Sequence, residues 1–304
     1  AYLERLRWYS SREIGTSMSD GAFKVALCYP NLYSVASASL GYQSVYRIIR
    51  SLPGMSASRA MWPDPDMEDE LPSDGVRTIE DEFPLTQYPV VAFSISYEMD
   101  IAGIARMLDL ARIPALSEKR DEEDPFILIG GPVTFSNPLP LAPFADAIMM
   151  GEGEETLETV LKELEASTSN QERRERLAQI PGMYVPELHG TLAPEPQTVE
   201  AHHLPAYSAY WTPESEFSNM FLVEASRGCP RFCKFCIVRA TNTPMRYRGV
   251  DEVLSRIPLE APRVGFVGAG VSEYPQIKDA LRVCVDRGQE VGLSSLRADR
   301  LDDE

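Results

Sequence analysis

The chain has 304 residues, of which 44% are hydrophobic and 25% are charged, a composition typical of soluble globular proteins with about two domains. It contains no run of about 18 apolar residues, so we expect no membrane-spanning helix. The formal net charge of −17 argues against a general nucleic-acid-binding protein, because contacts to phosphates require an excess of Lys and Arg.

The N-terminal residues 1–15 are polar and charged, and they lack the apolar core of a signal peptide. We therefore expect a cytoplasmic protein, in which the five cysteines stay reduced. Reduced cysteines favour metal ligation or catalysis over disulfide bonds.

Short apolar runs alternate with helical patterns in the first half of the chain. Four candidate strands are apolar almost throughout, and they span residues 23–28, 90–96, 126–130 and 147–150. Two apolar stripes at helical spacing lie beside them: Ile101, Ile104, Ala105 and Leu108 behind a candidate N-cap at Asp100, then Leu157, Val160, Leu161 and Leu164. This alternation indicates a parallel sheet covered on both faces. We predict an α/β fold with a doubly wound, Rossmann-like domain over residues 20–166, after an N-terminal extension of residues 1–19.

Two segments outside these elements are polar. Residues 64–82 carry nine acids and one arginine, so we expect a solvated surface loop there. Residues 167–219 are polar and rich in proline, which predicts a linker with room for one short hairpin. All three histidines lie in this linker, at His189, His202 and His203. Because adjacent loop histidines lack the spacing of metal ligands, we interpret His202 and His203 as polar surface residues.

Alternation of strands and helices resumes at residue 220. The expected elements are strands at 220–226, 263–268 and 290–295, a helix from about residue 251 and a helix over 275–287. Three such units make neither a closed barrel nor an open sheet of the usual size. We therefore expect this chain to be part of a longer protein.

Three of the five cysteines lie in eight residues, CPRFCKFC, after the first of these strands. They are Cys229, Cys233 and Cys236, in the spacing Cys-x3-Cys-x2-Cys. The surrounding window, residues 225–250, contains six basic residues and no acid. Such a basic surrounding favours thiolates that hold a metal cluster, or a ligand with a carboxylate, although a chance basic turn remains an alternative.

The number of thiols decides which metal centre they suit. A structural zinc site needs four ligands, and a fourth cysteine is not at hand. Cys284 lies on an apolar helical stripe with Ile277 and Leu281, and Cys28 ends an apolar strand, so both are expected in the core. Three thiolates suit a 4Fe–4S cluster with one iron left open to a substrate or cofactor.

The stretch SRGCPRFCKFC resembles the signature of radical S-adenosylmethionine (SAM) enzymes, and residues 220–304 would form the first part of their (β/α) barrel. The resemblance implies that Cys229, Cys233 and Cys236 ligate three irons of a 4Fe–4S cluster, with SAM chelating the fourth. It also implies a set of SAM-binding residues, among them the aromatic before the last cysteine, a glycine-rich turn and the end of the third strand: Phe235, Gly268, Ala269, Gly270, Ser294, Ser295 and Arg297. The turn reads GAGVSE, where the family more often has Gly-Gly-Glu.

The N-terminal domain resembles the cobalamin-binding-type domain that precedes the barrel in one radical SAM subgroup. The likeness rests on VALCYPNLYSVASASLG, VVAFSISYE, FILIGGPVTFSNP and DAIMMGEGEETLETVLKEL. It implies that cobalamin, if bound, contacts Ser94, Gly130, Gly131, Gly151 and Gly153. This domain contains no histidine, which excludes an axial histidine from it. Whether the domain binds cobalamin or serves as a scaffold stays open.

Most of residues 20–304 resemble a bacterial group of uncharacterised radical SAM proteins. This implies an enzyme that cleaves SAM reductively to a 5′-deoxyadenosyl radical, with an electron donor such as a flavodoxin or ferredoxin. With cobalamin it would be a methyltransferase. One alternative is an iron–sulfur interaction or sensing protein without catalysis. Another is methylthiolation of RNA or protein, which is disfavoured because such enzymes carry three further cysteines in a domain where this chain has only Cys28.

Overall fold

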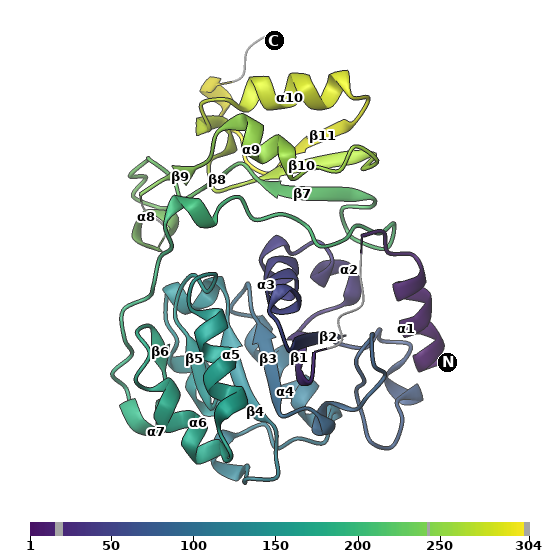
Figure 1. Cartoon of the computed structure of the whole chain (residues 1–304), viewed down its shortest axis with the longest axis vertical. Helices are drawn as coiled ribbons and strands as arrows, with labels where there is room; N and C mark the ends of the chain where they lie inside the picture. Colours follow the sequence, from purple (N-terminus) through teal and green to yellow (C-terminus); the bar gives the residue numbers. More distant parts are fainter. Residues whose placement is uncertain (16–20, 242–243, 301–304) are drawn as a thin grey trace.

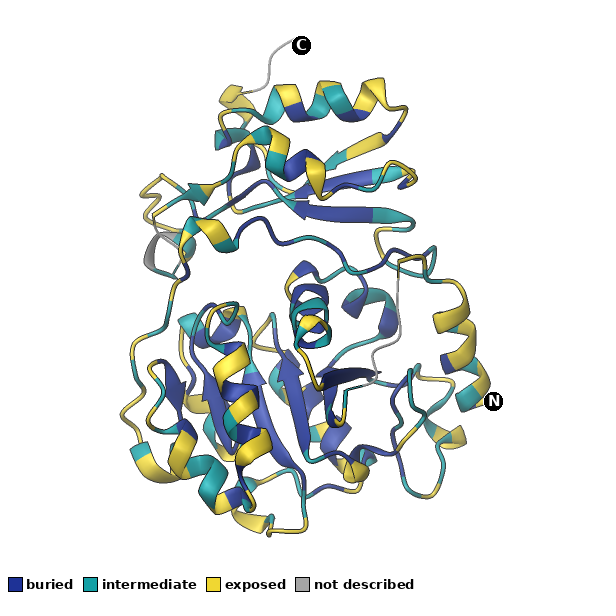
Figure 2. Ribbon diagram, in the orientation of Figure 1, coloured by how far each residue is buried: buried dark blue, intermediate teal, exposed yellow. Residues whose placement is uncertain are grey.

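The computed structural model describes residues 1–15, 21–241 and 244–300. Two sheets organise these residues (Figure 1): a six-stranded sheet in the N-terminal part and a three-stranded sheet in the C-terminal part. The buried residues concentrate in the strands of the N-terminal sheet and in two strands of the C-terminal sheet (Figure 2). Within the described part of the chain, no helix is long and apolar enough to cross a membrane.

The six-stranded sheet has the order β2-β1-β3-β4-β5-β6. Its first five strands are parallel, and only the last pairs antiparallel to its neighbour. In chain order the strands are β1 (Phe23–Tyr29), β2 (Met55–Met61), β3 (Val90–Ser94), β4 (Phe126–Gly130), β5 (Ala147–Met149) and β6 (Met183–Tyr184). The strand order reverses between β1 and β3, and open sheets of this kind bind ligands beyond the carboxyl ends of the strands at such a point.

Helices cover both faces of this sheet, as predicted. Side chains alternate along β1, so that Val25 and Leu27 belong to one core and Ala26 and Cys28 to the other. The first core is closed by α1 (Tyr2–Ser11), α3 (Leu40–Ser51), α5 (Leu157–Ala166) and α6 (Asn170–Leu177). The second core is closed by α4 (Asp100–Leu110). The leucine and valine stripe predicted for residues 157–164 is buried in α5.

The structure corrects the expected boundaries of this domain. The segment expected as a linker contains α6, β6 and α7 (Pro186–His189), and β6 pairs with β5, so its first part belongs to the N-terminal sheet. The N-terminal extension contains α1, whose Tyr2 and Leu6 enter the core. The elements of the linker were not predicted, because α6 is almost wholly polar and β6 is only two residues long.

Two local predictions were wrong. Asp100 lies inside α4 rather than at its N-cap, and its carboxylate accepts the backbone N–H groups of Ser96 and Tyr97. Residues 64–82 are not a solvated loop, because Val76 and Ile79 are buried. Several acids of that segment pair with basic residues from other elements, which include Arg5, Arg59 and Arg106.

The three-stranded sheet is parallel and has the order β11-β10-β7. Its strands are β7 (Met220–Glu224), β10 (Arg263–Val267) and β11 (Glu290–Leu293), with α9 (Val250–Ser255) and α10 (Ile277–Asp286) on the face away from the N-terminal sheet (Figure 1). Consecutive parallel strands joined by helices agree with the expected first part of a (β/α) barrel. Cys284 lies on the buried side of α10 and Cys28 within β1, so both belong to the core, as expected.

The two parts of the molecule pack against each other through α3 and the chain that enters β7. Leu40 of α3 contacts Ala206 and Leu222 in one apolar cluster. The side chain of Gln43 accepts the backbone N–H groups of Ala209 and Tyr210. The short helix α2 (Tyr33–Ala36) precedes α3 on the same side. These contacts bring the carboxyl ends of the N-terminal strands beneath the C-terminal sheet.

Candidate functional site

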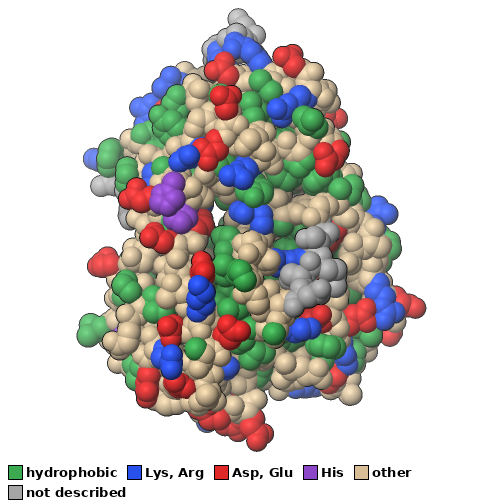
Figure 3. Space-filling view, in the orientation of Figure 1, with side chains coloured by type: hydrophobic (Ala, Val, Ile, Leu, Met, Phe, Trp, Pro, Cys, Tyr) green, Lys and Arg blue, Asp and Glu red, His purple; other side chains and the backbone are tan. Residues whose placement is uncertain are grey.

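A cavity of about 610 Å³ lies between the two parts of the molecule, at the carboxyl ends of β3, β4 and β5. Figure 3 shows a hollow at this junction, with hydrophobic side chains at its edge. The volume falls within the range of about 300–1,000 Å³ that is usual for ligand pockets. All five residues predicted to contact cobalamin line it: Ser94, Gly130, Gly131, Gly151 and Gly153.

The glycines around the cavity are required for different reasons. Gly131 and Gly151 have φ angles of 119° and 90°, and a Cβ on either would lie 2.2 Å from a backbone oxygen, of Ile95 and Gln197 respectively. Both are therefore explained by the backbone alone. At Gly130 an added Cβ would meet nothing nearer than Met149, at 3.8 Å. This position leaves the strand end open toward the cavity.

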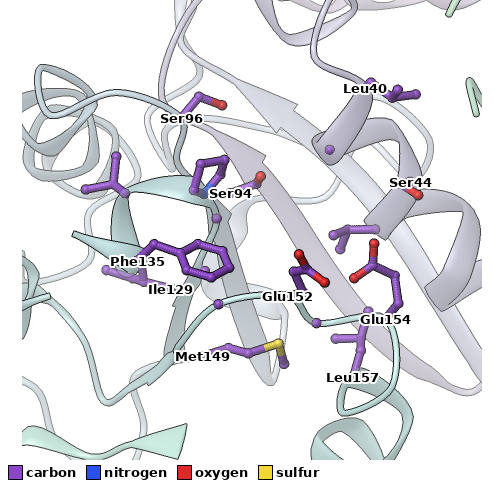
Figure 4. Close-up of a pocket in the computed structure, with 18 of the residues that line it drawn as sticks. Leu40, Ser44, Ser94, Ser96, Ile129, Phe135, Met149, Glu152, Glu154 and Leu157 are labelled. Atoms are coloured by element: carbon purple, nitrogen blue, oxygen red, sulfur yellow. The ribbon is translucent and has the colours of Figure 1, made fainter. Parts of the chain in front are cut away.

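The wall of the cavity is largely apolar, with carboxylates on one side. Leu40, Ile129, Phe135 and Leu157 are among the apolar lining residues. Figure 4 shows Phe135 and the carboxylates of Glu152 and Glu154 reaching into the same space. The described residues that line the cavity include no histidine, so a bound corrin would receive no imidazole from them.

The three cysteines lie on a loop that hangs from a two-stranded ladder. β8 (Ser226–Arg227) pairs antiparallel with β9 (Arg246–Tyr247), and the loop between them carries α8 (Val238–Thr241). Cys233 is exposed, and Cys229 and Cys236 are half-buried. Among the described residues, no three metal-binding side chains are gathered around one point. The donors themselves fit an iron–sulfur cluster, because they are three thiols on one short loop and such ligands gather when the metal binds.

The glycine-rich turn after β10 lies next to this loop. A Cβ added at Gly270 would come within 3.5 Å of the Cys229 sulfur. The hydroxyls of Ser294 and Ser295 both donate to the carbonyl of Gly268, at 3.2 and 2.8 Å. The turn, the third strand end and the first cysteine therefore meet at one place, as the resemblance implies for a SAM site.

One polar atom at this place has no partner. Ser226 is 1% exposed, and its hydroxyl forms no hydrogen bond with the described residues. It lies beneath the turn, 3.3 Å from where a Cβ of Gly268 would be. A buried hydroxyl without a partner is costly, so a bound ligand that supplies one would be stabilised here.

Three of the predicted SAM-binding residues are either exposed or already engaged in ion pairs. Phe235 is 93% exposed, and Ala269 is exposed on the turn. Arg297 pairs with Glu273 at 2.6 Å and with Asp299 at 2.6 Å. Burial acts to raise the pKa of Glu273, but the hydrogen bonds from Arg297 and Arg231 hold that pKa below its ordinary value. Arg297 therefore already has partners at the site.

The basic window around the cysteines is compensated by acids from other parts of the chain. Arg231 pairs with Glu273, and Arg248 pairs with Glu252. Arg227 contacts three carboxylates, those of Glu154 at 2.6 Å, Glu224 at 2.7 Å and Glu152 at 3.3 Å. Four of the six basic residues in the window, Arg227, Arg231, Arg246 and Arg248, are therefore paired with acids, which reduces the positive excess around the cysteines. Glu152, Glu154 and Glu273 are distant in sequence from the arginines they pair with, and only the fold brings them together. Glu224 and Glu252 lie three and four residues from their partners.

Glu152 is the centre of the contact between the two parts. Both nitrogens of the Arg246 fork donate to its carboxylate, at 2.6 and 2.8 Å, and the N–H of Val199 donates to it at 2.8 Å. Burial acts to raise the pKa of Glu152, but Arg246 and Arg227 hold it below the ordinary value. For Arg227, burial acts to lower the pKa, but Glu224 and Glu154 raise it above the ordinary value.

Sequence reasoning missed the role of Glu152, Glu154, Arg227 and Arg246. A signal was present in the charge pattern, since an acid-rich turn in one domain and an acid-free, base-rich window in the other are complementary. The histidines give no site: His189 accepts the Val185 N–H, and His202 is exposed beside His203.

Residues 41–186 match the family described as radical SAM proteins, N-terminal. The uncharacterized protein MJ0966 of Methanocaldococcus jannaschii is 25% identical over 239 residues, which cover 76% of this chain and 49% of that protein.

Two solved structures of the radical SAM methyltransferase TsrM from Kitasatospora setae share the fold. One contains tryptophan and a SAM analogue, and the other contains cobalamin and a [4Fe-4S] cluster. Both are 14% identical, with TM-scores of 0.57 and 0.56 over 87% and 89% of this chain and 51% of TsrM. The chain thus spans about half the length of the relatives it matches.

The structural likeness confirms the predicted α/β architecture, a doubly wound N-terminal domain followed by the first part of a radical SAM barrel. At 14% identity, this likeness is evidence for the fold alone. The match of residues 41–186 adds a relationship in sequence. The chain is therefore similar to radical SAM proteins in the sequence of residues 41–186 and in its fold.

Proposed function

We propose that this chain is the cofactor-binding part of a radical SAM enzyme, and that the enzyme transfers a methyl group with the help of cobalamin. Cys229, Cys233 and Cys236 would hold a 4Fe–4S cluster, and SAM would lie against the turn at Gly268–Gly270. When bound, the cluster supplies the electron that cleaves SAM to methionine and a 5′-deoxyadenosyl radical. The chain's own residues orient these groups and line the cavity.

One observation supports cobalamin in particular. The wall of the cavity is built from the strand ends of the N-terminal sheet and from residues on either side of the cysteine loop. Glu224 and Arg227 precede Cys229, and Ile237 and Val238 follow Cys236, and all four line the cavity. A ligand in the cavity would therefore sit beside the cluster, where a methyl carrier is needed.

The two alternative functions have less support. Methylthiolation by a second cluster would need further thiols near the N-terminal sheet, yet Cys28 is fully buried within β1 and burial raises its pKa. An iron–sulfur sensing protein would have no need for a cavity of this size against the loop. The turn at Gly268 beside Cys229 also favours a bound cofactor over a cluster alone.

Anaerobic reconstitution with iron and sulfide tests the proposal. We expect the visible absorption and the reduced-state EPR signal of a 4Fe–4S cluster, and their loss in Cys233→Ser. The matched control is Cys284→Ser, which removes a core cysteine away from the loop. With dithionite and SAM, methionine and 5′-deoxyadenosine should form. A cluster that leaves SAM intact would instead support the sensing protein.

Cobalamin binding is tested separately by equilibrium titration, followed through the visible spectrum of the corrin. We expect saturable binding to the 304-residue chain, and competition between cobalamin and a bulky side chain placed at Gly130. Binding that is unchanged by that substitution would argue against this cavity as the site.

A further inference from the structure

The cysteine loop is anchored to the N-terminal domain at its base. The ladder that closes the loop has only two residue pairs, Ser226 with Tyr247 and Arg227 with Arg246. Both arginines of the second pair extend into the GEGEE turn of the N-terminal domain. Arg227 reaches Glu154 at 2.6 Å, and Arg246 reaches Glu152 at 2.6 Å.

These contacts are strong because they are shielded from water. The side chains of Arg227 and Arg246 are each 12% exposed, and those of Glu152 and Glu154 are 5% and 16% exposed. Charge-assisted hydrogen bonds in such surroundings are short and directional. A ladder of two pairs is too short to be stable by itself, so the ion pairs hold the base of the loop.

The path from the anchored arginine to the first cysteine is one residue long. Gly228 follows Arg227 with a φ of 83°, a left-handed conformation that turns the chain toward Cys229. The direction in which the loop leaves the sheet is therefore set next to the anchored residue. A shift of Arg227 would carry Cys229 with it.

The GEGEE turn also faces the ligand cavity. Gly151, Glu152, Gly153 and Glu154 all line it, and so does Arg227. An occupant of the cavity would contact the same turn that holds the base of the loop. The N-terminal domain can in this way act on the cysteine loop without contacting the cysteines.

We propose that Glu154 and Arg227 are positioning residues: their ion pair fixes the base of the cysteine loop and so sets the geometry of the metal centre. The part of this inference that concerns the metal centre rests on the proposed function and is tested by the EPR spectrum of the cluster. The first measurement uses the metal-free chain and asks whether the ladder between β8 and β9 depends on the ion pair.

Hydrogen exchange of the metal-free chain is measured for segments 224–228 and 245–249. In Glu154→Gln, which keeps the shape and removes the charge, exchange there should become roughly tenfold faster. Arg227→Lys should have a similar effect, because a single ammonium cannot replace the planar fork. Glu155→Gln is the matched control, since Glu155 is 65% exposed and its described ionic contact is to His203 at 4.0 Å. Segments in β3 and β4 report whether each variant is folded.

The second measurement is the EPR spectrum of the reduced cluster with and without SAM. We expect Glu154→Gln to bind iron like the wild type but to give an altered spectrum with SAM, whereas Glu155→Gln gives the wild-type spectrum. Unchanged exchange at the ladder in both Glu154→Gln and Arg227→Lys would overturn the proposal. If the wild type forms no cluster, the proposed function fails, while the exchange measurement still decides whether the ion pair fixes the base of the loop.

Discussion

Glu152 and Arg246 lie 94 residues apart and form a two-pronged ion pair between the N-terminal domain and the base of the cysteine loop. The carboxylate belongs to the turn after β5, and the guanidinium belongs to β9. The second nitrogen of the fork also donates to the carbonyl of Val199. The pair therefore joins three segments that are distant in sequence, and it adds to the contacts of Leu40 and Gln43 between the two parts.

We expect Glu152→Gln to weaken this junction considerably. The substitution leaves Arg246 buried without its full charge partner, a change that typically costs about 2–3 kcal/mol or more. Urea denaturation followed by tryptophan fluorescence measures the loss, because Trp211 lies in the core of the C-terminal part. Glu158→Gln is the control, since Glu158 pairs with Lys162 on an exposed face and its loss should have little effect. Equal destabilisation by both substitutions would contradict the assignment.

The same junction should respond to acid. The pKa of Glu152 lies below its ordinary value of 4.5, so its ionised form is favoured by folding. Its contribution is then fully present above about pH 4.5 and is lost as the pH falls through the folded-state pKa. We expect the stability difference between the wild type and Glu152→Gln to be constant from about pH 7 to about pH 5 and to narrow below that. A difference that grows with acid would reverse the predicted sign.

Thiol reactivity should separate the cysteines into two groups. Cys229, Cys233 and Cys236 are at least partly exposed, whereas Cys28 and Cys284 are fully buried and burial raises the pKa of both. In the folded, metal-free chain we expect three thiols to react quickly with a thiol reagent and two to react only on unfolding. Reconstitution with iron and sulfide should protect the three fast thiols. Fast reaction of a fourth thiol would show that the core around Cys28 or Cys284 opens.

Adjacent glycines at the end of β4 should respond in opposite ways to the same substitution. Gly130→Val places its side chain in open space beside the cavity, so we expect a stable protein that binds cobalamin at least about tenfold more weakly. Gly131→Val would collide with the backbone of Ile95 at a φ of 119°, so we expect loss of the fold itself. Thermal denaturation and cobalamin titration of both variants distinguish the two effects. Weak binding accompanied by low stability in Gly130→Val would count against the cavity assignment.

The order of strands and helices could be predicted from the sequence because buried parallel strands are apolar throughout. β4 was predicted at its observed bounds, and the stripe of α5 was buried as expected. β2 was not predicted, because MSASRAM alternates small, polar and apolar residues and contains a buried arginine. Its place beside β1 depends on Arg59 finding partners from distant segments. A local sequence pattern does not reveal which distant residues will pair with Arg59.

The candidate site also contains residues that local sequence predicts and residues that it does not. Glycines and cysteines at strand ends are local signals, and the structure brings the predicted glycines to one cavity and the turn at Gly270 to Cys229. The ion pairs between Glu152, Glu154 and the arginines depend on how two domains meet, which spacing along the chain does not encode. For the same reason the pairing of Arg227 and Arg246 with the GEGEE turn could not be predicted.

Arg59 provides the strictest test of how such distant partners stabilise the fold. Its side chain is fully buried, with Glu13 at 2.8 Å and Glu80 at 2.6 Å, and stacks on Tyr46 and Tyr210. Arg59→Met leaves two buried carboxylates without their cation, so we expect a loss of about 3–5 kcal/mol by urea denaturation. The control is Arg7→Met, which breaks an exposed pair with Glu82 and should change stability little.

A second variant separates charge from packing at this position. In Arg59→Met combined with Glu13→Gln and Glu80→Gln, no buried charge remains unpaired, so most of the lost stability should return. The comparison is between the single and the combined variant under the same conditions. If the combined variant were less stable than Arg59→Met alone, the cost would lie in lost packing against Tyr46 and Tyr210 rather than in unpaired carboxylates. Recovery would show that the loss in Arg59→Met comes mainly from the unpaired carboxylates of Glu13 and Glu80.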